Sequence, residues 1–558
     1  MVLPNEQVND LLTKVGVDQK TLNDLIIFTD NAKISLQEAA IEKNVITDEK
    51  LGMLIAASLK MPFISLSKVS IPEPVFRIIP ERIARKYKVL AFGRDGTGIK
   101  LAMANPKETQ LQEMVIKKTG QKIVPYYATE RDIENSMQLY KKNLQELFDD
   151  LLQTEVPTKT TSDDAPIVKM IEILVTRAYQ DKASDIHIEP QEKNIIIRFR
   201  IDGILHDVLS LEKRHHDRIV TRIKILSKLR TDEHLSPQDG KMRMQVDDEN
   251  LDIRTSIIPI ADGEKVVLRL LSSHFRQFSL QDLGMSDTDL KKINNAINKS
   301  YGMILSTGPT GSGKTTLIYS ILKILNTRQK NITTIEDPVE YRIKAVNQIQ
   351  VNTKTKLTFA NGLRSILRQD PDIIFVGEIR DSETAGIAVN AALTGHLVLS
   401  TIHTTNAATA LPRLIDMEIE PFLVASTVDI IVAQRLVRRI CESCKIKALA
   451  KRSDLLKNFP EKSITKYFGS QDNIKVMQGQ GCKMCHYTGF SGRIGIFEVI
   501  DVSNTVRKLI TQKSDSDVIN KAAIEEGMTT MLEDGLEKVA KGVTTISEVL
   551  RVTKVESA

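Results

Sequence analysis

The sequence predicts an α/β protein whose C-terminal half is built on a parallel sheet. From about residue 281 onward, short apolar strands alternate with helical patterns, the order expected of strand–helix–strand units. A glycine-rich loop lies between one such strand and the next helix, and three later segments end in polar clusters. Open α/β sheets bind ligands at the carboxyl ends of their strands, so these clusters are expected to share one site.

The bulk composition is that of a globular protein with several domains. The chain has 558 residues, too many for one core, with 41% hydrophobic and 27% charged residues. The net charge of +6 is the small difference between 77 basic and 71 acidic residues, which favours a generally solvated surface. Aromatic residues make up 4% and there is no Trp. A base-stacking platform is therefore disfavoured, and no nucleic-acid partner is expected.

The sequence shows no targeting or membrane segment. Its start, "MVLPNEQVND", has neither a basic region nor an apolar one, so no signal peptide is expected. No run of 18 or more apolar residues occurs. The stretch "FLVASTVDIIVA", residues 422–433, is broken by Ser, Thr and Asp and is interpreted as a buried helix. We expect a cytosolic protein that reaches a membrane only through partners.

The first 145 residues are predicted to form short amphipathic helices and a few strands. Residues 34–66 indicate two helices joined at "KNVITDE", where Thr47 is the expected N-cap of the second helix. Residues 153–166, "QTEVPTKTTSDDAP", combine Pro, Thr, Ser and Asp without apolar periodicity, which predicts an interdomain linker, assigned to residues 146–165.

A second unit is predicted over residues 166–275. Its strands include "SDIHIEP" and "IIIRFRIDGIL", and Asp202-Gly203 is typical of a two-residue hairpin turn. "RLLSSHFRQFSL", residues 269–280, is interpreted as a second connection before the α/β region.

The glycine-rich loop "GPTGSGKTT" is predicted to hold phosphates. An apolar strand precedes it and an amphipathic helix follows it, the context in which this spacing is meaningful. Its glycines let successive N–H groups point inward, the helix start adds positive potential, Lys314 reaches the β- and γ-phosphates, and the Thr315 hydroxyl is a candidate Mg²⁺ ligand. The candidate nucleotide-binding residues are Gly308, Pro309, Thr310, Gly311, Ser312, Gly313, Lys314, Thr315 and Thr316.

Polar side chains follow three strands downstream of this loop. Glu336 follows the β-branched strand in "ITTIEDPVE", Glu378 follows the strand in "PDIIFVGEIRD", and His403 ends the strand in "TGHLVLSTIHTTNA". Each could be an ordinary solvated group at a strand end. Because parallel strands bring their carboxyl ends to one edge, the three are predicted to lie together as catalytic candidates.

The four cysteines predict a structural zinc site. They occur only as "CESC", Cys441 and Cys444, and "CKMC", Cys482 and Cys485. A disulfide is not expected in the cytosol, and each pair presents two thiolates to one metal ion. Four thiolates complete a tetrahedral, non-catalytic site, so His486 is not needed as a ligand. The long separation between the pairs predicts an inserted subdomain.

Several segments together resemble the secretion-ATPase superfamily of type II secretion and type IV pilus motors. "GPTGSGKTTLIYS", "TTIEDPVEY", "LRSILRQDPDIIFVGEIRD" and "TGHLVLSTIHTTNA" are similar to its Walker A, Asp-box, Walker B and His-box segments. "ASDIHIEP" and "RFRIDGIL" resemble its second N-terminal domain. The resemblance covers roughly residues 165–555 and implies an ATPase that requires ATP and Mg²⁺.

The resemblance also implies a domain plan. The long N-terminal region resembles the family's first N-terminal domain (N1), and the two CxxC pairs resemble its zinc module. The chain is therefore similar to the pilus-assembly, or extension, ATPase, with the type II secretion motor as the alternative. The implied domains are an N-terminal α/β domain (1–145), a PAS-like α+β domain (N2, 166–275) and a RecA-like motor domain (281–558). A tetra-cysteine module (436–490) lies inside the last.

The same resemblance implies a homohexamer that acts on an inner-membrane platform protein. Nucleotide then lies between the two lobes of each subunit, and arginines of the smaller lobe complete the site. The matching positions are Arg254 in "LDIRTSIIP" and Arg269 in "EKVVLRLL", and Arg364 and Arg368 match further arginines. A guanidinium beside the γ-phosphate stabilises the charge that develops in phosphoryl transfer.

The two glutamates divide one catalytic task. Glu378 is expected to reach the Mg²⁺ shell while Glu336 polarises the attacking water, and the reverse assignment stays open. Two readings from other classes also remain: a nucleic-acid translocase, and a scaffold that binds ATP but barely hydrolyses it. Some relatives bind cyclic di-GMP through the N-terminal domain. Here the expected Arg is missing, Asn44 replaces a Gly and Ser58 stands near an expected Gln, so partner docking is favoured.

Overall fold

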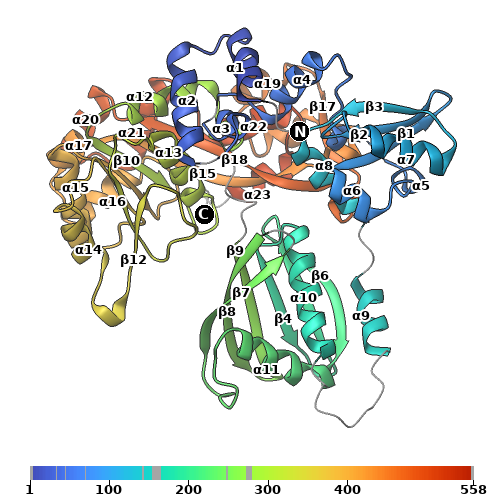
Figure 1. The fold of residues 1–558 in the computed structure, drawn as a ribbon. Coiled ribbons are helices and arrows are strands. Elements are labelled where there is room, and N and C mark those ends of the chain that lie inside the picture. Colours follow the sequence, from blue (N-terminus) through green and yellow to red (C-terminus); the bar gives the residue numbers. More distant parts are fainter. Residues whose placement is uncertain are drawn as a thin grey trace. The chain divides into compact units, whose positions relative to one another are not determined.

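The structure is a computed structural model (Figure 1) that describes residues 4–32, 34–43, 45–69, 71–140, 144–153, 165–246, 249–271 and 279–553. The chain divides into two compact units. The larger unit comprises residues 1–70, 94–132 and 277–558, and the smaller unit comprises residues 71–93 and 133–276.

The two predicted connections fall mostly outside the described residues. Within the predicted linker 146–165, residues 146–153 continue helix α9 (Leu144–Gln153), and residues 154–164 are not described. Within the predicted connection 269–280, residues 272–278 are not described.

The larger unit is organised around a seven-stranded sheet in the order β12-β11-β13-β14-β10-β15-β18. Its strands are β10 (Gly302–Thr307), β11 (Ile332–Glu336), β12 (Asn347–Gln350), β13 (Ile373–Val376), β14 (Leu397–Ile402), β15 (Val428–Ile440) and β18 (Phe490–Asp501). All neighbours pair in parallel except β15 and β18, which are antiparallel. The predicted parallel α/β architecture is confirmed, with one antiparallel strand at its edge.

Helices cover both faces of this sheet, as Figure 1 shows. Met303 and Leu305 of β10 belong to one core cluster and Ile304 to the other, because successive side chains of a strand point to opposite faces. Helices α12 (Asp287–Ile297) and α13 (Lys314–Leu325) pack into the cluster of Ile304. The other cluster contains residues of α14 (Phe359–Ile366), α15 (Ser382–Leu393), α16 (Ala410–Asp416), α17 (Pro421–Thr427), α20 (Asn504–Thr511) and α21 (Ser516–Glu525).

The prediction of one buried helix over residues 422–433 is wrong. Residues 422–427 lie in α17, but the chain then enters β15 at Val428. Val428 and the apolar residues after it are largely β-branched, which favours a strand, and apolar content alone does not separate a buried strand from a buried helix.

The segment between the cysteine pairs forms a small subdomain of the larger unit, as predicted. Strands β16 (Lys445–Lys451) and β17 (Asn473–Gly479) pair as an antiparallel ribbon, and α18 (Arg452–Leu456) and α19 (Glu461–Phe468) connect them. Its core includes Leu455 and Ile464 and continues into Leu536 of α22 (Met531–Ala540) and Val549 of α23 (Ile546–Thr553). This packing anchors the ribbon to the C-terminal helices.

The smaller unit contains a six-stranded antiparallel sheet in the order β6-β5-β4-β9-β8-β7. The strands are β4 (Asp185–Pro190), β5 (Asn194–Ile201), β6 (Ile204–Glu212), β7 (Gln238–Val246), β8 (Glu249–Ile260) and β9 (Gly263–Leu271). Helices α10 (Ala165–Gln180) and α11 (His216–Leu226) pack on it. The predicted turn joins β5 to β6: Asp202 and Gly203 have φ values of 50° and 85°, positive at both positions as a tight hairpin requires.

The N-terminal region combines helices with strands, which confirms its predicted α/β character. Helices α1 (Asn5–Lys14), α2 (Gln19–Ala32), α3 (Leu36–Glu42) and α4 (Asp48–Ser58) share one core cluster. Thr47 caps α4 as predicted, since its side chain accepts a hydrogen bond from the Lys50 N–H.

Strands β2 (Gly98–Met103) and β3 (Ile123–Tyr127) pair in parallel around α7 (Thr109–Thr119). Asn44, used in the cyclic di-GMP comparison, lies outside the described residues.

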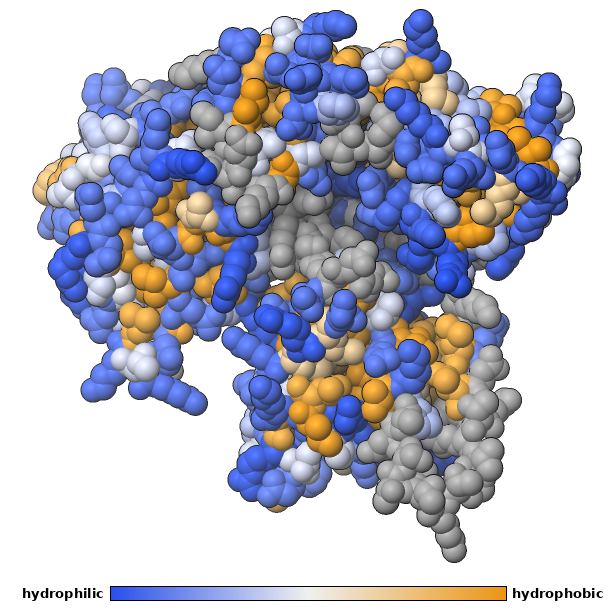
Figure 2. Space-filling model, in the orientation of Figure 1, coloured by the Kyte–Doolittle hydropathy of each residue, from blue (hydrophilic) through white to orange (hydrophobic). Residues whose placement is uncertain are grey.

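The visible surface is predominantly hydrophilic. Figure 2 shows hydrophilic residues over most of one face, with hydrophobic residues in smaller groups, including over the strands of the smaller unit. Within the described parts of the chain, no helix combines the length and apolar character that crossing a bilayer requires.

Candidate active site and candidate metal centre

The predicted phosphate loop connects β10 to α13, at the carboxyl end of an interior strand of the sheet. Gly308 and Gly313 have φ values of 144° and 94°, which only glycine adopts readily. A Cβ on Gly308 would lie 2.6 Å from the Gln434 carbonyl oxygen, and one on Gly313 would lie 2.8 Å from Gln434 Nε2. The loop therefore requires glycine at both ends, because it packs directly against β15.

Lys314 begins α13 and is directed into the curl of the loop. Its Nζ donates hydrogen bonds to the carbonyl oxygens of Gly308 (2.7 Å) and Pro309 (3.0 Å). Burial lowers the pKa of Lys314 to about 8, against the opposing effect of the Glu378 carboxylate. An ammonium group already removed from water interacts strongly with an incoming phosphate, since the local dielectric is low.

Glu378 contacts His403 and acts electrostatically on Lys314, in keeping with the prediction that polar groups at the ends of parallel strands meet. It follows β13, and its carboxylate contacts Arg380 (2.5 Å) and the Nε2 atom of His403 (3.3 Å). Burial, followed by the nearby Lys314 charge, lowers the pKa of His403. Glu378 Oε2 is buried, and the His403 Nε2 atom at 3.3 Å is the contact that the structure shows for it. A carboxylate oxygen with so few partners is available to a cation.

Glu336 ends β11, the parallel neighbour of β13. Gly377, just before Glu378, donates its N–H to the Ile335 carbonyl (2.8 Å), and a Cβ on Gly377 would lie 3.2 Å from the Glu336 Cα. Glycine at position 377 thus lets the two strand ends approach closely. The Glu336 side chain is buried, which raises the pKa of its carboxyl.

Four polar residues near this site were missed by sequence reasoning. Gln434 on β15 is fully buried beside Gly313, and neither polar atom of its amide has a hydrogen-bond partner among the described residues. Tyr319 and Gln348 donate to Glu336, and Arg380 pairs with Glu378. Only Tyr319 carried a usable signal, because it stands four residues after Thr315 and so shares its face of α13.

Arg254 and Arg269 lie in the smaller unit and face each other across β8 and β9. They line a cavity of about 430 Å³ that also includes Asp239 of β7 and Lys241, the cross-strand partner of Arg254. Asp185 pairs with Arg269 at 2.9 Å. Like charges placed across neighbouring strands repel, so this group favours an anion, and Lys241 is a member that the sequence did not reveal.

Arg364 lies on α14 of the larger unit, and Arg368 lies two residues after the end of this helix. Arg364 pairs with Glu383 at 2.7 Å, and Arg368 donates to the Arg364 carbonyl and the Ser365 hydroxyl. In the contacts that the described residues make, none of these partners belongs to the phosphate loop or contacts the two glutamates.

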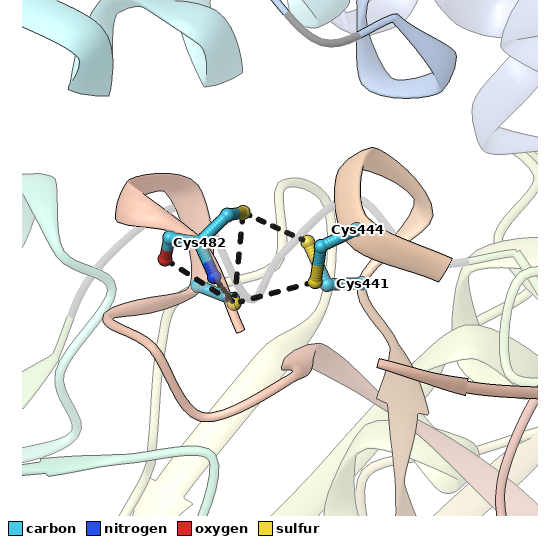
Figure 3. A group of neighbouring side chains, drawn as sticks. Cys441, Cys444 and Cys482 are labelled. Atoms are coloured by element: carbon cyan, nitrogen blue, oxygen red, sulfur yellow. Dashed lines mark hydrogen bonds between the residues drawn. The ribbon is translucent and has the colours of Figure 1, made fainter. Parts of the chain in front are cut away.

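The four predicted metal ligands lie together (Figure 3). Their Sγ atoms are all within 4.8 Å of one another, and the Cys441–Cys482, Cys444–Cys485 and Cys482–Cys485 pairs are 3.8, 3.8 and 3.7 Å apart. Zn–S bonds of about 2.3 Å in a tetrahedron require sulfurs about 3.8 Å apart. A disulfide would need about 2.05 Å. The cluster therefore fits one tetrahedral zinc ion.

Backbone N–H groups support this donor set. Each pair ends in a short 3-10 turn, Glu442–Cys444 and Lys483–Cys485, which directs both thiols of the pair to one side. The N–H groups of Gly481 and Gly489 donate to the sulfurs of Cys444 and Cys485, each at 3.3 Å. Hydrogen bonds from the Cys441 thiol and from the backbone hold the pKa of Cys485 below its usual range, which favours the thiolate that a metal requires.

We expect one zinc ion per subunit, and the double variant Cys482→Ser/Cys485→Ser should lose it. Without the ion, the two turns at the base of the β16–β17 ribbon lose the bonds through the four thiolates and keep backbone hydrogen bonds such as that from the Gln480 N–H to the Cys444 carbonyl. The ribbon should therefore become more sensitive to protease. Elemental analysis and limited proteolysis measure the two effects. His486→Ala is the matched control and should retain zinc. A wild-type protein purified without chelators that contains no zinc would remove the metal centre.

Comparison with known proteins places these features in one family. Residues 160–551 match the family model described as type II/IV secretion system protein, and residues 59–146 match an MshEN domain. The chain is 45% identical over 416 residues to the type II secretion system protein E of Pseudomonas aeruginosa, covering 74% of this chain and 80% of that protein. It is 36% identical over 530 residues to the type IV pilus assembly ATPase PilB of Myxococcus xanthus, covering 92% of both.

A solved structure shares the fold. The ATPase DotB of Legionella pneumophila superposes with a TM-score of 0.51 at 21% identity, covering 72% of this chain and 98% of that one. This likeness concerns the fold alone. It agrees with the predicted RecA-like motor domain preceded by a smaller domain.

Proposed function

The chain belongs to the type II/IV secretion system protein family, whose members hydrolyse ATP, and we propose that it is the motor that assembles and extends a type IV pilus. In this proposal it works as a homohexamer on the cytoplasmic side of the inner membrane. Hydrolysis is converted into motion of a membrane platform protein, and the chain reaches the membrane only through such partners.

One observation carries the choice of a pilus system: the match to a pilus assembly ATPase extends over 92% of both chains, including the N-terminal region. The matches to type II secretion system protein E cover 74% of this chain for the Pseudomonas aeruginosa protein and 82% for the Dickeya dadantii protein. A type II secretion motor is the second candidate, because identity to the Pseudomonas aeruginosa protein is higher, 45% against 36%.

The phosphate loop binds the nucleotide through its N–H groups, the start of α13 and Lys314. The Thr315 hydroxyl and the Glu378 carboxylate would hold Mg²⁺, since both are the hard oxygen ligands that this ion prefers. When bound, Mg²⁺ neutralises charge on the β- and γ-phosphates. In our assignment, Glu336 orients the attacking water and accepts its proton.

Arg254 and Arg269 are proposed to stabilise the charge that develops on the transferred phosphoryl group. They face each other at register partners in β8 and β9, and their cavity presents two guanidinium groups and an ammonium group. Removing an arginine that has this role leaves nucleotide binding largely unchanged but slows the chemical step.

Arg254→Ala and Arg269→Ala should each lower kcat for ATP hydrolysis by about 10²- to 10³-fold, the cost of removing one preorganised charge donor. Asp185 keeps Arg200 at 3.6 Å when Arg269 is removed, so the fold should persist. Steady-state hydrolysis measures the effect, with light scattering to confirm the assembly. Arg243→Ala is the control, because Arg243 pairs with Asp252 outside the cavity. Normal rates in both test variants would contradict this role.

A pull-down from the native organism distinguishes the two systems. The full chain should capture an inner-membrane platform protein, and the filament subunit associated with that protein should be a pilin. A pseudopilin in its place would support the type II secretion motor. Salt-sensitive DNA binding with DNA-stimulated hydrolysis would instead support a nucleic-acid translocase.

A further inference from the structure

The Glu336 carboxylate is held by three donors from three different elements. Oε2 accepts a short hydrogen bond from the Tyr319 hydroxyl of α13. Oε1 accepts one from the Thr334 hydroxyl of its own strand (2.5 Å) and one from Gln348 Nε2 of β12 (3.2 Å). Only 2% of Glu336 is exposed. Its orientation is therefore determined by these neighbours rather than by solvent.

Tyr319 connects this carboxylate to the phosphate-binding end of α13. It stands four residues after Thr315, so the two side chains lie one above the other on the same face of the helix. Its ring is fully buried and meets Tyr341 and Phe375 edge to face, with ring centroids 4.6 and 6.2 Å apart. Burial raises the pKa of Tyr319, so its hydroxyl stays a proton donor at neutral pH. Ring and hydroxyl are thus fixed in one position.

Gln348 connects the same carboxylate to the loop after β11. Its Oε1 accepts the Ile343 N–H at 2.8 Å, and its Nε2 donates to the Tyr341 carbonyl at 3.1 Å as well as to Glu336. The amide therefore holds the loop and the carboxylate at once. Of the three donors to Glu336 among the described residues, Tyr319 is the one that belongs to the phosphate-binding helix α13.

We propose that Tyr319 is a positioning residue: its hydroxyl sets the orientation of the Glu336 carboxylate and transmits to it any shift of α13 that accompanies phosphate binding. The inference rests on the proposed function, because it needs Glu336 to act in hydrolysis. A purely structural role is a poorer explanation. A buried hydroxyl–carboxylate pair costs desolvation that an apolar pair of equal volume would avoid, so packing alone does not require it.

Tyr319→Phe tests the proposal, because it keeps the ring and removes only the hydroxyl. We expect kcat for ATP hydrolysis to fall by about 10- to 100-fold while the KM for ATP stays within about twofold, since orientation is lost but the phosphate loop is untouched. Thermal unfolding confirms that the variant is folded. Tyr301→Phe is the matched control: it removes the hydroxyl of a tyrosine that is 57% exposed, just before β10 begins, and should hydrolyse like the wild type.

The pH profile gives a readout that a packing defect would not produce. Two titratable groups act on the Glu336 carboxyl: Tyr319 of α13, whose hydrogen bond lowers its pKa, and Glu340 of the following loop, whose charge raises it. Removing the Tyr319 hydroxyl should raise the pKa of Glu336 further. The acidic limb of kcat should therefore move to higher pH in Tyr319→Phe, and part of the lost rate should return as pH increases.

A double-mutant cycle separates failure of this inference from failure of the proposed function. If Tyr319 acts through Glu336, adding Tyr319→Phe to Glu336→Gln should lower kcat no further. Wild-type kinetics in Tyr319→Phe, together with lost turnover in Glu336→Gln, would overturn the inference and leave the ATPase mechanism standing. Full turnover in Glu336→Gln would overturn both the inference and the assigned role of Glu336. Additive losses would also overturn the inference.

Discussion

Lys314→Ala is expected to lower ATP hydrolysis by at least about 10²- to 10³-fold and to weaken nucleotide binding, because it removes the cation closest to the phosphates. The structure gives a reason for a large effect. Nζ is partly buried and donates hydrogen bonds to the Gly308 and Pro309 carbonyls. Much of the free-energy cost of removing water from this ammonium group therefore arises on folding, before a phosphate binds. Exchanging two neutral carbonyls for an anionic phosphate is then strongly favourable in a low dielectric.

Hydrolysis is measured by phosphate release, and binding by titration with a fluorescent nucleotide. Lys330→Ala is the control, because Lys330 is an exposed lysine in the turn after α13 and should leave both quantities unchanged. Equal hydrolysis rates in the wild type and in Lys314→Ala would contradict the enzyme assignment. They would favour the scaffold that binds nucleotide without using it.

Glu336→Gln should abolish turnover while Mg²⁺–ATP binding remains, with kcat lowered by about 10²- to 10⁴-fold, the typical contribution of a general base. Glutamine preserves size and can still accept from Tyr319, but it cannot take a proton from water. Glu378→Gln should instead weaken the Mg²⁺ dependence of binding, because a neutral amide replaces a negatively charged oxygen ligand of the kind that Mg²⁺ prefers.

Each variant needs two titrations, with ATP and with Mg²⁺, in addition to the turnover rate. Glu383→Gln is the matched control, since this glutamate is exposed on α15 and pairs only with Arg364 in the described contacts. If Glu378→Gln loses turnover with binding intact while Glu336→Gln loses the Mg²⁺ dependence, the two roles are reversed. Unchanged turnover in both variants would remove the two-glutamate site.

Features encoded within one short segment were predictable from the sequence. The loop from Gly308 to Thr315 carries its strand and helix on either side, and each CxxC pair presents both thiols from a single turn. Asp202-Gly203 needs positive φ at two adjacent positions, which only a few residue pairs accept. The prediction of one helix over residues 422–433 was wrong for the corresponding reason. Buried helices and buried strands share an apolar composition, so composition could not show that the helix ends and a strand begins at Val428.

Contacts between distant segments were not predictable in the same way. Neighbouring parallel strands were expected to bring the strand ends of Glu336 and Glu378 together. Two of the donors to Glu336 come from α13 and β12, however, and nothing in their local spacing identifies Gln348. Gln434, packed against Gly313 from more than a hundred residues away, gave no local signal either. The same holds for Lys241 opposite Arg254, which depends on strand register.

The sequence by itself determined the chemistry available to this protein: a phosphate loop, two glutamates at strand ends, two arginines and four thiols. The loop, the glutamates and the thiols follow from the residue types and spacing within one element, where backbone geometry leaves few conformations, whereas the two arginines follow only from the resemblance to the secretion ATPases. Only the tertiary structure decided which side chains orient these groups. Such contacts depend on the packing of elements far apart in the chain, and packing selects partners by shape and by the need of every buried polar atom for a hydrogen bond.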